Sequence, residues 1–184
     1  MRRLAGICVV VVVSCLMAGC SPASSGDDPV SSTPVVVEST PSPSPTPTWS
    51  GEQQAAIDAV QKYLQVWAEI TQNLGTSDWD QIYEVAYGPI TNTDMDAWKQ
   101  WNDQGLFLVG HPSFTTSWVT SGAQDTVGKI YHVGGCYIIE GSYLSDASGT
   151  RVPVEAQRQP STFDVLEGAN GQNLVTDSRN EGTC

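Results

Sequence analysis

The hydrophobic pattern of the chain is clearest between Ser50 and Gly75. Its apolar residues recur there at intervals of three and four: Ile57, Val60, Leu64, Trp67, Ile70 and Leu74. This spacing places them on one face of an α-helix of about six turns. Ser50 and Gln53 stand at the spacing of a capping box, in which each residue hydrogen-bonds the backbone of the other. We therefore predict a long amphipathic helix that begins near Ser50 and ends before Gly75.

Two shorter helices are expected after Gly75. The first would start at Ser77 and stop at the breaker pair Gly88-Pro89. The second would start at Thr93, with Asp96 three residues later, and end at Gly105. Their apolar residues are Trp79, Ile82 and Val85 in the first helix, and Met95, Trp98 and Trp101 in the second.

Four aspartates fall in the first turns of these two helices: Asp78, Asp80, Asp94 and Asp96. Negative charge is favourable at a helix start because of the helix dipole. A calcium loop of the EF-hand type would need a glycine-containing run of carboxylates, and the sequence has none. We interpret the four as helix-start acids.

The period changes from helical to alternating after Gly105. Short runs of β-branched and aromatic residues are separated there by clusters of Gly, Ser, Asp and Pro, which is typical of strands and turns. Residues 146–149 (Asp-Ala-Ser-Gly) and Asn170-Gly171 are hairpin signals, because both contain residues that accept positive φ. The predicted strands are 106–109, 114–119, 127–133, 137–143, 152–157, 162–166 and 174–176. Helices followed by sequential hairpins indicate an α+β fold with an antiparallel sheet packed on the long helix.

This order of elements, one long helix, two short helices and then a strand meander, resembles the NTF2-like cone. In that superfamily a strongly curved sheet wraps around the long helix. The resemblance covers residues 50–184 and implies the same arrangement here.

The first nineteen residues have the pattern of an export signal. Arg2 and Arg3 precede an apolar run from Leu4 to Gly19, which at 16 residues is shorter than the roughly 20 that a membrane-spanning helix needs. The pentapeptide at residues 16–20, Leu-Met-Ala-Gly-Cys, resembles the lipobox of bacterial lipoproteins. That resemblance implies that Cys20 becomes the lipidated N-terminus after residues 1–19 are removed. A plain cleaved signal and an uncleaved anchor are the alternatives.

Residues 20–49 are expected to form a tether between the lipidated Cys20 and a folded head, residues 50–184. The tether is rich in Ser, Thr and Pro, and its Pro-Ser-Pro-Ser-Pro-Thr-Pro-Thr repeat favours extended polyproline II. The whole plan is similar to that of uncharacterised lipoproteins of high-GC Gram-positive bacteria. It implies a protein held by its lipid on the outer face of the cell membrane.

The charge of the chain limits its partners. The net charge is −12, and removal of the signal leaves six basic against twenty acidic residues, a net charge of −14. Such a surface repels phosphate backbones and anionic headgroups, so we expect no nucleic-acid partner. The lipid on Cys20 must then supply the attachment to the membrane.

Two cysteines remain in the expected head, Cys136 and Cys184. An exported domain with two thiols favours a disulfide between them. A ring of about fifty residues would stabilise the fold by roughly 4 kcal/mol on the loop-entropy model. The alternative, a metal or catalytic thiol, has no supporting His or Cys cluster.

Candidate chemistry is sparse. Enzymes of the NTF2-like superfamily use an Asp or an Asp/His pair with Tyr inside the cone. The groups available here for such a role are His111, His132, Glu140, Asp164, Tyr131, Tyr137 and Tyr143. His132 and Glu140, on neighbouring predicted strands, are the candidate general acid/base pair. Trp67 and Trp118 are candidates for the pocket wall, and His111 is interpreted as a loop residue. No nucleophile motif, phosphate loop or metal motif occurs, so we expect no cofactor and no metal.

These observations favour a non-catalytic surface lipoprotein whose acidic head binds an envelope protein or a ligand. Two alternatives remain. One is an NTF2-like pocket enzyme of the isomerase or dehydratase type. The other is a phage or prophage surface-exclusion lipoprotein.

Overall fold

The computed structural model describes residues 47–124, 127–152, 158–182 and 184. The predicted signal, Cys20 and nearly all of the tether lie outside the described residues. All described helices and strands belong to one unit, residues 45–184.

The long helix is confirmed as α1, Gly51–Gln72. Its capping box is formed as predicted: the Gln53 backbone N–H donates to Ser50 Oγ at 3.3 Å, and the Ser50 N–H donates to Gln53 Oε1 at 2.9 Å. The buried face contains Ala56, Ile57, Val60, Tyr63, Leu64, Ala68, Ile70 and Thr71. The predicted apolar stripe therefore faces the core.

The two shorter helices differ from their predicted starts. The first is a 3₁₀-helix, η1, Trp79–Glu84, and Asp78 rather than Ser77 is its cap, accepting a hydrogen bond from the Asp80 N–H. The second, α2, spans Pro89–Asp103. The predicted start at Thr93 was wrong because Pro89 opens this helix: a proline in the first turn has its φ already set and needs no N–H partner there. The predicted end of this helix at Gly105 is confirmed: α2 stops at Asp103, and Gly105 has a φ of +66°, a conformation that ends a helix.

The strands form two antiparallel sheets. A four-stranded sheet has the order β2-β3-β6-β7, and a three-stranded sheet has the order β1-β4-β5. Their bounds are β1 Leu106–Val109, β2 Ser113–Gln124, β3 Gly128–Ile138, β4 Tyr143–Asp146, β5 Arg151–Val152, β6 Arg158–Gly168 and β7 Asn173–Arg179. Both hairpin signals are confirmed, with Gly149 at φ +83° between β4 and β5 and Gly171 at φ +75° between β6 and β7.

One predicted strand was wrong, residues 137–143. β3 continues to Ile138, and a turn follows in which Gly141 has a φ of +81° and the Ser142 N–H donates to the Ile139 carbonyl at 2.8 Å. Tyr143 then starts β4 in the other sheet. Of the predicted strand 152–157, only Val152 lies within the described residues.

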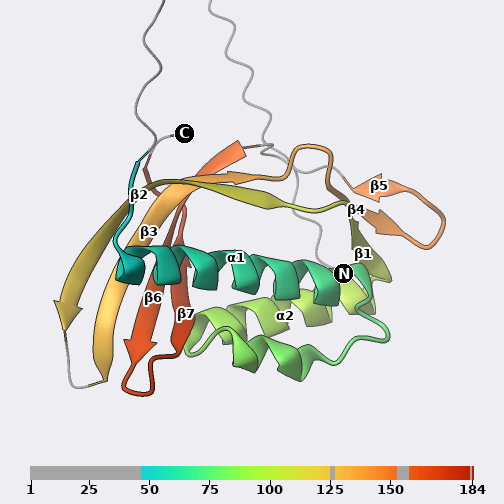
Figure 1. The fold of residues 1–184 in the computed structure, drawn as a ribbon. Helices are drawn as coiled ribbons and strands as arrows, with labels where there is room; N and C mark the ends of the chain where they lie inside the picture. Colours follow the sequence, from blue (N-terminus) through green and yellow to red (C-terminus); the bar gives the residue numbers. More distant parts are fainter. Residues whose placement is uncertain (1–46, 125–126, 153–157, 183) are drawn as a thin grey trace, which may run out of the picture. The chain divides into compact units, whose positions relative to one another are not determined.

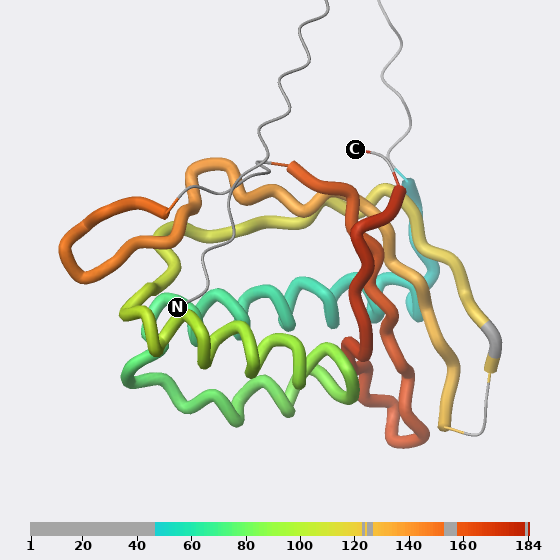
Figure 2. The backbone as a smooth tube through the Cα atoms, turned by 180° about the vertical axis from the view of Figure 1, so that it is seen from behind, coloured from blue at the N-terminus to red at the C-terminus, as the bar shows by residue number. Residues whose placement is uncertain are grey.

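The four-stranded sheet curves around α1, and β2 and β3 arch over the helix (Figure 1). Seen from behind, α1 and α2 run side by side with β6 and β7 across one end (Figure 2). The core lies between sheet and helix, and its sheet residues are Phe114, Val119, Tyr131, Val133, Phe163, Val165 and Val175. The fold is α+β, with helices packed on antiparallel sheets, and is compatible with the predicted NTF2-like cone.

Both edges of the four-stranded sheet are partly covered. On β2, the carbonyls of Val119 and Phe114 accept hydrogen bonds from Gln53 and Gln61 of α1. On β7, Val175 exchanges backbone hydrogen bonds with residues 85 and 87. Such cover limits pairing with another chain. No helix in the described part of the chain is long and apolar enough to cross a membrane.

The structure contains the predicted disulfide between Cys136 and Cys184. Cys136 lies in β3, and the two Cα atoms are 5.3 Å apart, within the usual range for a bridge. The bond fastens the last residue of the chain to the middle of the sheet.

We expect the chain from residue 21 onward, which lacks Cys20, to show no free thiol when unfolded without reductant and two after reduction. Replacing both Cys136 and Cys184 by Ser should lower the free energy of unfolding by about 4 kcal/mol, because the unfolded chain regains the entropy of the open loop. Thiol titration and urea unfolding measure these quantities. Two titratable thiols without reduction would contradict the disulfide.

Candidate functional site

A buried carboxylate joins the two α-helices. The Asp94 side chain of α2 accepts hydrogen bonds from the Tyr63 hydroxyl at 2.8 Å and from the Trp67 indole N–H at 3.1 Å. Tyr63 and Trp67 are one turn apart on α1, so both donors point to the same side of the helix. Only 9% of Asp94 is exposed. This carboxylate therefore fixes two aromatic side chains of α1 at once.

Burial changes the proton affinity of this cluster. It raises the pKa of Asp94 from 3.8 to about 6, although the hydrogen bonds from Tyr63 and Trp67 oppose the shift. Burial and the nearby Asp94 charge also raise the pKa of the Tyr63 and Tyr137 hydroxyls. Asp94 thus exchanges its proton near neutral pH while both tyrosines stay protonated.

Two hollows share Trp67 and Tyr137 in their walls. The first, which we call the apolar hollow, measures about 190 Å³. Its other aromatic walls are Trp101 and Tyr143, its aliphatic walls are Leu108, Pro112, Ile139 and Leu144, and Ser142 completes it. The second, the polar-rimmed hollow, measures about 140 Å³ and adds Tyr63, Leu64 and Phe163 to the shared pair, with a rim of Gln159, Ser161, Ser178 and Asn180. Among the described residues, no charged side chain lines either hollow.

The walls of the apolar hollow are held by contacts with one another and with residues outside it. The rings of Trp67 and Trp101 meet edge to face with centroids 5.9 Å apart. The Arg151 guanidinium lies over the Tyr143 ring, 4.0 Å from its centroid, a cation–π contact. Gln72 near the end of α1 donates to the Gly110 carbonyl at 2.8 Å, which ties the helix to the β1–β2 loop. The hollow is thus built from fixed side chains of both sheets and both α-helices.

The structure does not bring the four candidate pocket residues together. Trp67 lines both hollows. Trp118 is 39% exposed and lies across Gly134, where a Cβ would come within 2.0 Å of its indole. Glu140 is exposed after the end of β3 and pairs with Arg158. The predicted pairing of His132 with Glu140 was therefore wrong, because the strand that was to carry Glu140 ends at Ile138.

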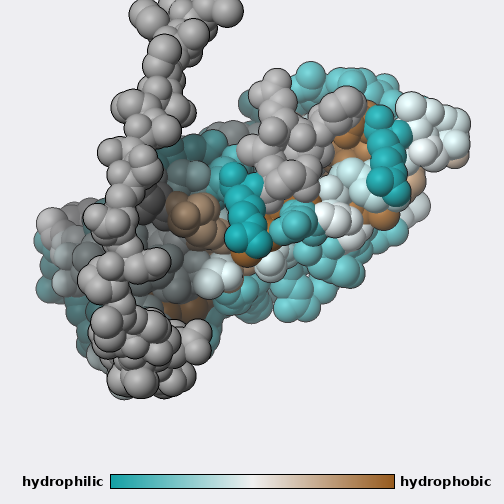
Figure 3. Space-filling view, turned by 90° about the horizontal axis from the view of Figure 1, so that it is seen from above, coloured by the Kyte–Doolittle hydropathy of each residue, from teal (hydrophilic) through white to brown (hydrophobic). Residues whose placement is uncertain are grey.

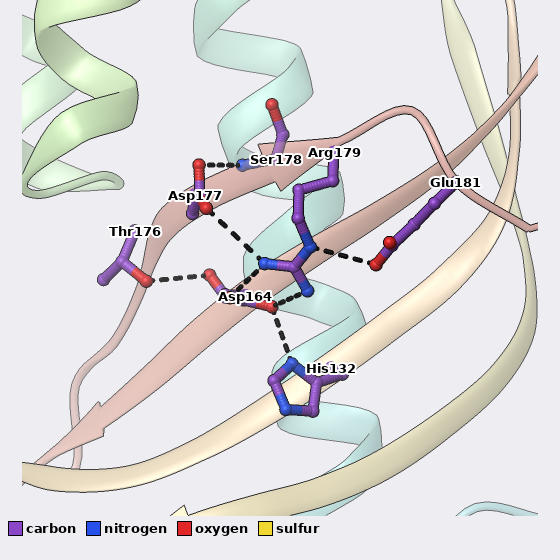
Figure 4. A network of polar contacts seen from close by, with 7 residues as sticks. All are labelled: His132, Asp164, Thr176, Asp177, Ser178, Arg179 and Glu181. Atoms are coloured by element: carbon purple, nitrogen blue, oxygen red, sulfur yellow. Dashed lines mark hydrogen bonds and ion pairs between the residues drawn. The ribbon is translucent and has the colours of Figure 1, made fainter.

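His132 meets a different carboxylate. Its Nδ1 is 2.6 Å from Asp164 Oδ1, because His132 of β3 stands directly opposite Asp164 of β6 in the sheet. Arg179 binds both oxygens of Asp164, at 2.6 and 2.9 Å, and also contacts Glu181 (Figure 4). Burial by itself would raise the pKa of Asp164. The hydrogen bonds from Arg179 and His132 outweigh burial and lower this pKa below its usual value.

This network faces away from the helix. His132 alternates along β3 with Tyr131 and Val133, which are buried in the core. Its Nε2 lies against the backbone of Gly122, where a Cβ would come within 2.8 Å. His132 lines neither hollow, so the network fastens β3, β6 and the end of β7 to one another.

Sequence reasoning placed Asp94 wrongly, as a helix-start acid. Because α2 begins at Pro89, Asp94 lies in its second turn and faces α1. The signal was present in the spacing: Asp94 stands four residues after Ile90 and four before Trp98, within the apolar stripe. If Gly88-Pro89 had been interpreted as the start of this helix, the spacing would have placed the Asp94 carboxylate on its buried face.

No family model and no curated protein matches the chain. Among solved structures, it is similar to the intermembrane space region of the chloroplast protein ARC6, with a TM-score of 0.54 and 14% identity over 74% of this chain and 100% of that one. It is also similar to a structure from Catenulispora acidiphila, with a TM-score of 0.42 and 12% identity over 71% of this chain and 93% of that one. A second structure from that organism, in complex with S-DNPA, has the same score and identity over 69% and 92%. At such identities the likeness to the ARC6 region shows a shared fold alone.

The raised pKa of Asp94 predicts a pH-dependent stability. Below about pH 4 the carboxyl is protonated in both folded and unfolded chains, and as the pH rises to about 6 only the unfolded chain ionises readily. The free energy of unfolding should therefore fall over this interval by up to about 3 kcal/mol from this group alone. Asp94→Asn should remove that part of the fall, as measured by urea unfolding at several pH values.

Asp96→Asn, at an exposed position of the same helix, is the matched control. An Asp94→Asn chain whose stability declines between pH 4 and 7 as steeply as that of the unchanged chain would contradict the assignment.

Proposed function

We propose that this protein is a lipid-anchored surface lipoprotein whose head binds a small, uncharged, largely apolar ligand in the apolar hollow. One observation carries the proposal: a strongly acidic chain contains an aromatic-lined hollow whose described wall residues are all uncharged. Sites for small ligands are typically concave, mostly apolar and equipped with few polar groups. The apolar hollow has this composition.

Charge narrows the ligand class. The mature chain would carry −14, so an anionic ligand would meet a repulsive field and no cationic wall residue. A cation would have to leave water for walls without a carboxylate, since Asp94 lies behind Trp67 and is held by two donors. The remaining driving force for ligand binding is the removal of apolar surface from water. Neutral ligands therefore fit the site best.

The lipid anchor in this proposal is inferred from the sequence. The lipobox at residues 16–20 supplies a diacylglyceryl attachment at Cys20, and two acyl chains suffice for stable membrane binding. The Ser/Thr/Pro tether then separates the head from the bilayer. Seen from above, the visible surface of the head is mostly hydrophilic, with apolar residues showing between polar ones (Figure 3). Such a head, held on the outer face of the membrane, meets ligands of the cell envelope.

The alternative of a pocket enzyme has one observation in its favour, the buried Asp94 with its pKa near 6 beside Tyr63 and Tyr137. A general acid or base is best placed when its pKa lies near the working pH. Asp94 is, however, outside the walls of both hollows, behind the two aromatic side chains that it binds. The geometry therefore supports binding better than catalysis.

Cys20→Ser should abolish incorporation of radioactive palmitate, because the thioether can form only on the lipobox thiol. Cys136→Ser, which removes a cysteine of the head, should leave labelling intact. The measurement is autoradiography of the protein after growth with the labelled fatty acid. Continued labelling of the Cys20→Ser chain would refute the anchor.

Ligand binding can be tested with toluene as an apolar probe of the right size. Titration should shift the indole N–H signals of Trp67 and Trp101 in an NMR spectrum of the chain from residue 21 onward. Ile139→Trp should abolish the shifts, because Ile139 is a wall residue and the larger side chain fills the space.

Ile138→Trp makes the same change at the neighbouring residue, which does not line the hollow, and should leave binding intact. Shifts that persist unchanged in the Ile139→Trp chain, or no shifts in the unchanged chain, would contradict the proposed site.

A further inference from the structure

The inner face of β6 becomes polar toward the start of the strand. Phe163 is buried in the core, and Ser161 and Gln159 precede it at intervals of two. Strand alternation places all three side chains on the face toward α1. All three line the polar-rimmed hollow, together with Trp67 of that helix. The hollow is therefore where the apolar inner face of the sheet gives way to polar side chains.

The end of β7 adds two polar side chains to the same hollow. Asp177 and Arg179 contact each other in the network on the outer face of the sheet. Ser178 and Asn180 alternate with them along the chain and therefore face the opposite way. Both are exposed and line the polar-rimmed hollow, so a ligand can reach them from solvent.

The polar side chains of this hollow are not used within the protein. No described residue hydrogen-bonds the side chain of Gln159, Ser161, Ser178 or Asn180. Ser161 is only 4% exposed, yet its unpaired hydroxyl is not fully enclosed, whereas that of the next residue, Thr162, is. A buried polar group without a partner is unfavourable. The hollow thus offers hydrogen bonds that a ligand can take up.

We propose that the polar-rimmed hollow binds a neutral sugar ring. Serine hydroxyls and side-chain amides both donate and accept hydrogen bonds, as the hydroxyls of a sugar do. Polar atoms form a substantial part of the lining, and the aromatic residues Trp67, Tyr137 and Phe163 form much of the rest. The C–H face of a sugar ring is apolar and packs on such a wall. This second ligand site goes beyond the binding function proposed for the apolar hollow.

The other ligand classes fit this hollow less well. Its described wall residues carry no charge and the chain is strongly acidic, so an anion would be repelled without finding a counter-charge. A cation would lose water without gaining a carboxylate. A wholly apolar ligand would cover the four polar side chains and leave them unpaired. A neutral ligand with several hydroxyls avoids each of these costs.

The size of the hollow limits the ligand to one ring. A cavity of about 150 Å³ holds a benzene ring, and this hollow measures about 140 Å³. Because its rim residues Ser178 and Asn180 are exposed, the ring can extend beyond the rim. The sugar is therefore either a free monosaccharide or the end unit of a longer glycan.

The test is an NMR titration of the chain from residue 21 onward with the methyl glycosides of glucose, galactose and mannose. At least one should shift the side-chain amide signals of Gln159 and Asn180, with a dissociation constant in the millimolar range that so small a ligand reaches. Methoxycyclohexane, a six-membered ring without hydroxyls, should leave these signals in place. No shift with any of the three glycosides, or equal shifts with methoxycyclohexane, would overturn the inference.

Ser161→Ala should weaken binding of the sugar about five- to tenfold, because one hydrogen bond is lost. Thr162→Val is the matched control: Thr162 is equally buried, but strand alternation turns its hydroxyl to the other face of the sheet. It should leave the dissociation constant unchanged. Equal affinities of the Ser161→Ala chain and the unchanged chain, or an equal loss in both variants, would overturn the inference.

A second measurement needs no variant. Nuclear Overhauser contacts should appear between the ring protons of the bound glycoside and the Ser161 β-protons. Sugar contacts confined to residues outside the polar-rimmed hollow would overturn the inference.

Failure of this inference is distinguishable from failure of the proposed function, because Trp101 lines only the apolar hollow and Asn180 only the polar-rimmed one. Toluene shifts at Trp101 without glycoside shifts at Asn180 refute the sugar site and leave the proposed function standing. Glycoside shifts at Asn180 without toluene shifts at Trp101 refute the proposed function and support the sugar site.

Discussion

The carboxylate of Asp94 is the constraint on which the site depends. α1 has to bury one apolar face inside the curved sheet, and α2 has to pack beside it. Asp94 joins the two helices through Tyr63 and Trp67, and the desolvation that this costs is visible in its raised pKa. A charge so buried persists only where its partners are in place. The same contact turns Trp67 into a fixed wall, and the apolar hollow follows from where that wall stands.

Contacts on the outer face of the four-stranded sheet fasten β3, β6 and the end of β7 to one another. Arg179 and His132 bind Asp164 from both sides, and the Cys136–Cys184 bond fastens the last residue to β3. Ser178 and Asn180, on either side of Arg179 in the chain, form part of the rim of the polar-rimmed hollow. These contacts therefore hold part of the rim of the polar-rimmed hollow, which shares Trp67 and Tyr137 with the apolar hollow.

Local patterns predicted those parts of the fold that depend on local physics. α1 followed from the helical period and the capping box, and the hairpins at Gly149 and Gly171 followed from residues that accept positive φ. The disulfide followed from the count of cysteines in a head that was expected to be exported. Each of these signals lies within a short stretch or depends on composition alone.

The candidate site needed information that local patterns do not contain. His132 meets Asp164 because β3 pairs with β6. The two residues are 32 positions apart in the chain, and spacing alone does not reveal this pairing. Glu140 was misplaced because the turn at Gly141 and Ser142 was interpreted as strand, and that turn also brings Ser142 into the wall of the apolar hollow. The burial of Asp94 was missed because Pro89 was interpreted as the end of one helix and not as the start of the next. In the last two cases a misplaced element boundary was the cause of the error.

The claim that the apolar hollow is the ligand site of this protein is tested most directly by photoaffinity labelling in the native envelope. A neutral aromatic probe that carries a diazirine would be activated on intact cells, and the modified residues would be identified by mass spectrometry of the isolated protein. The account predicts attachment to wall residues such as Ile139 and Leu144, reduced by an excess of the unmodified ring compound. Attachment confined to exposed aromatic residues such as Tyr83 and Tyr87, with none at the hollow, would contradict it.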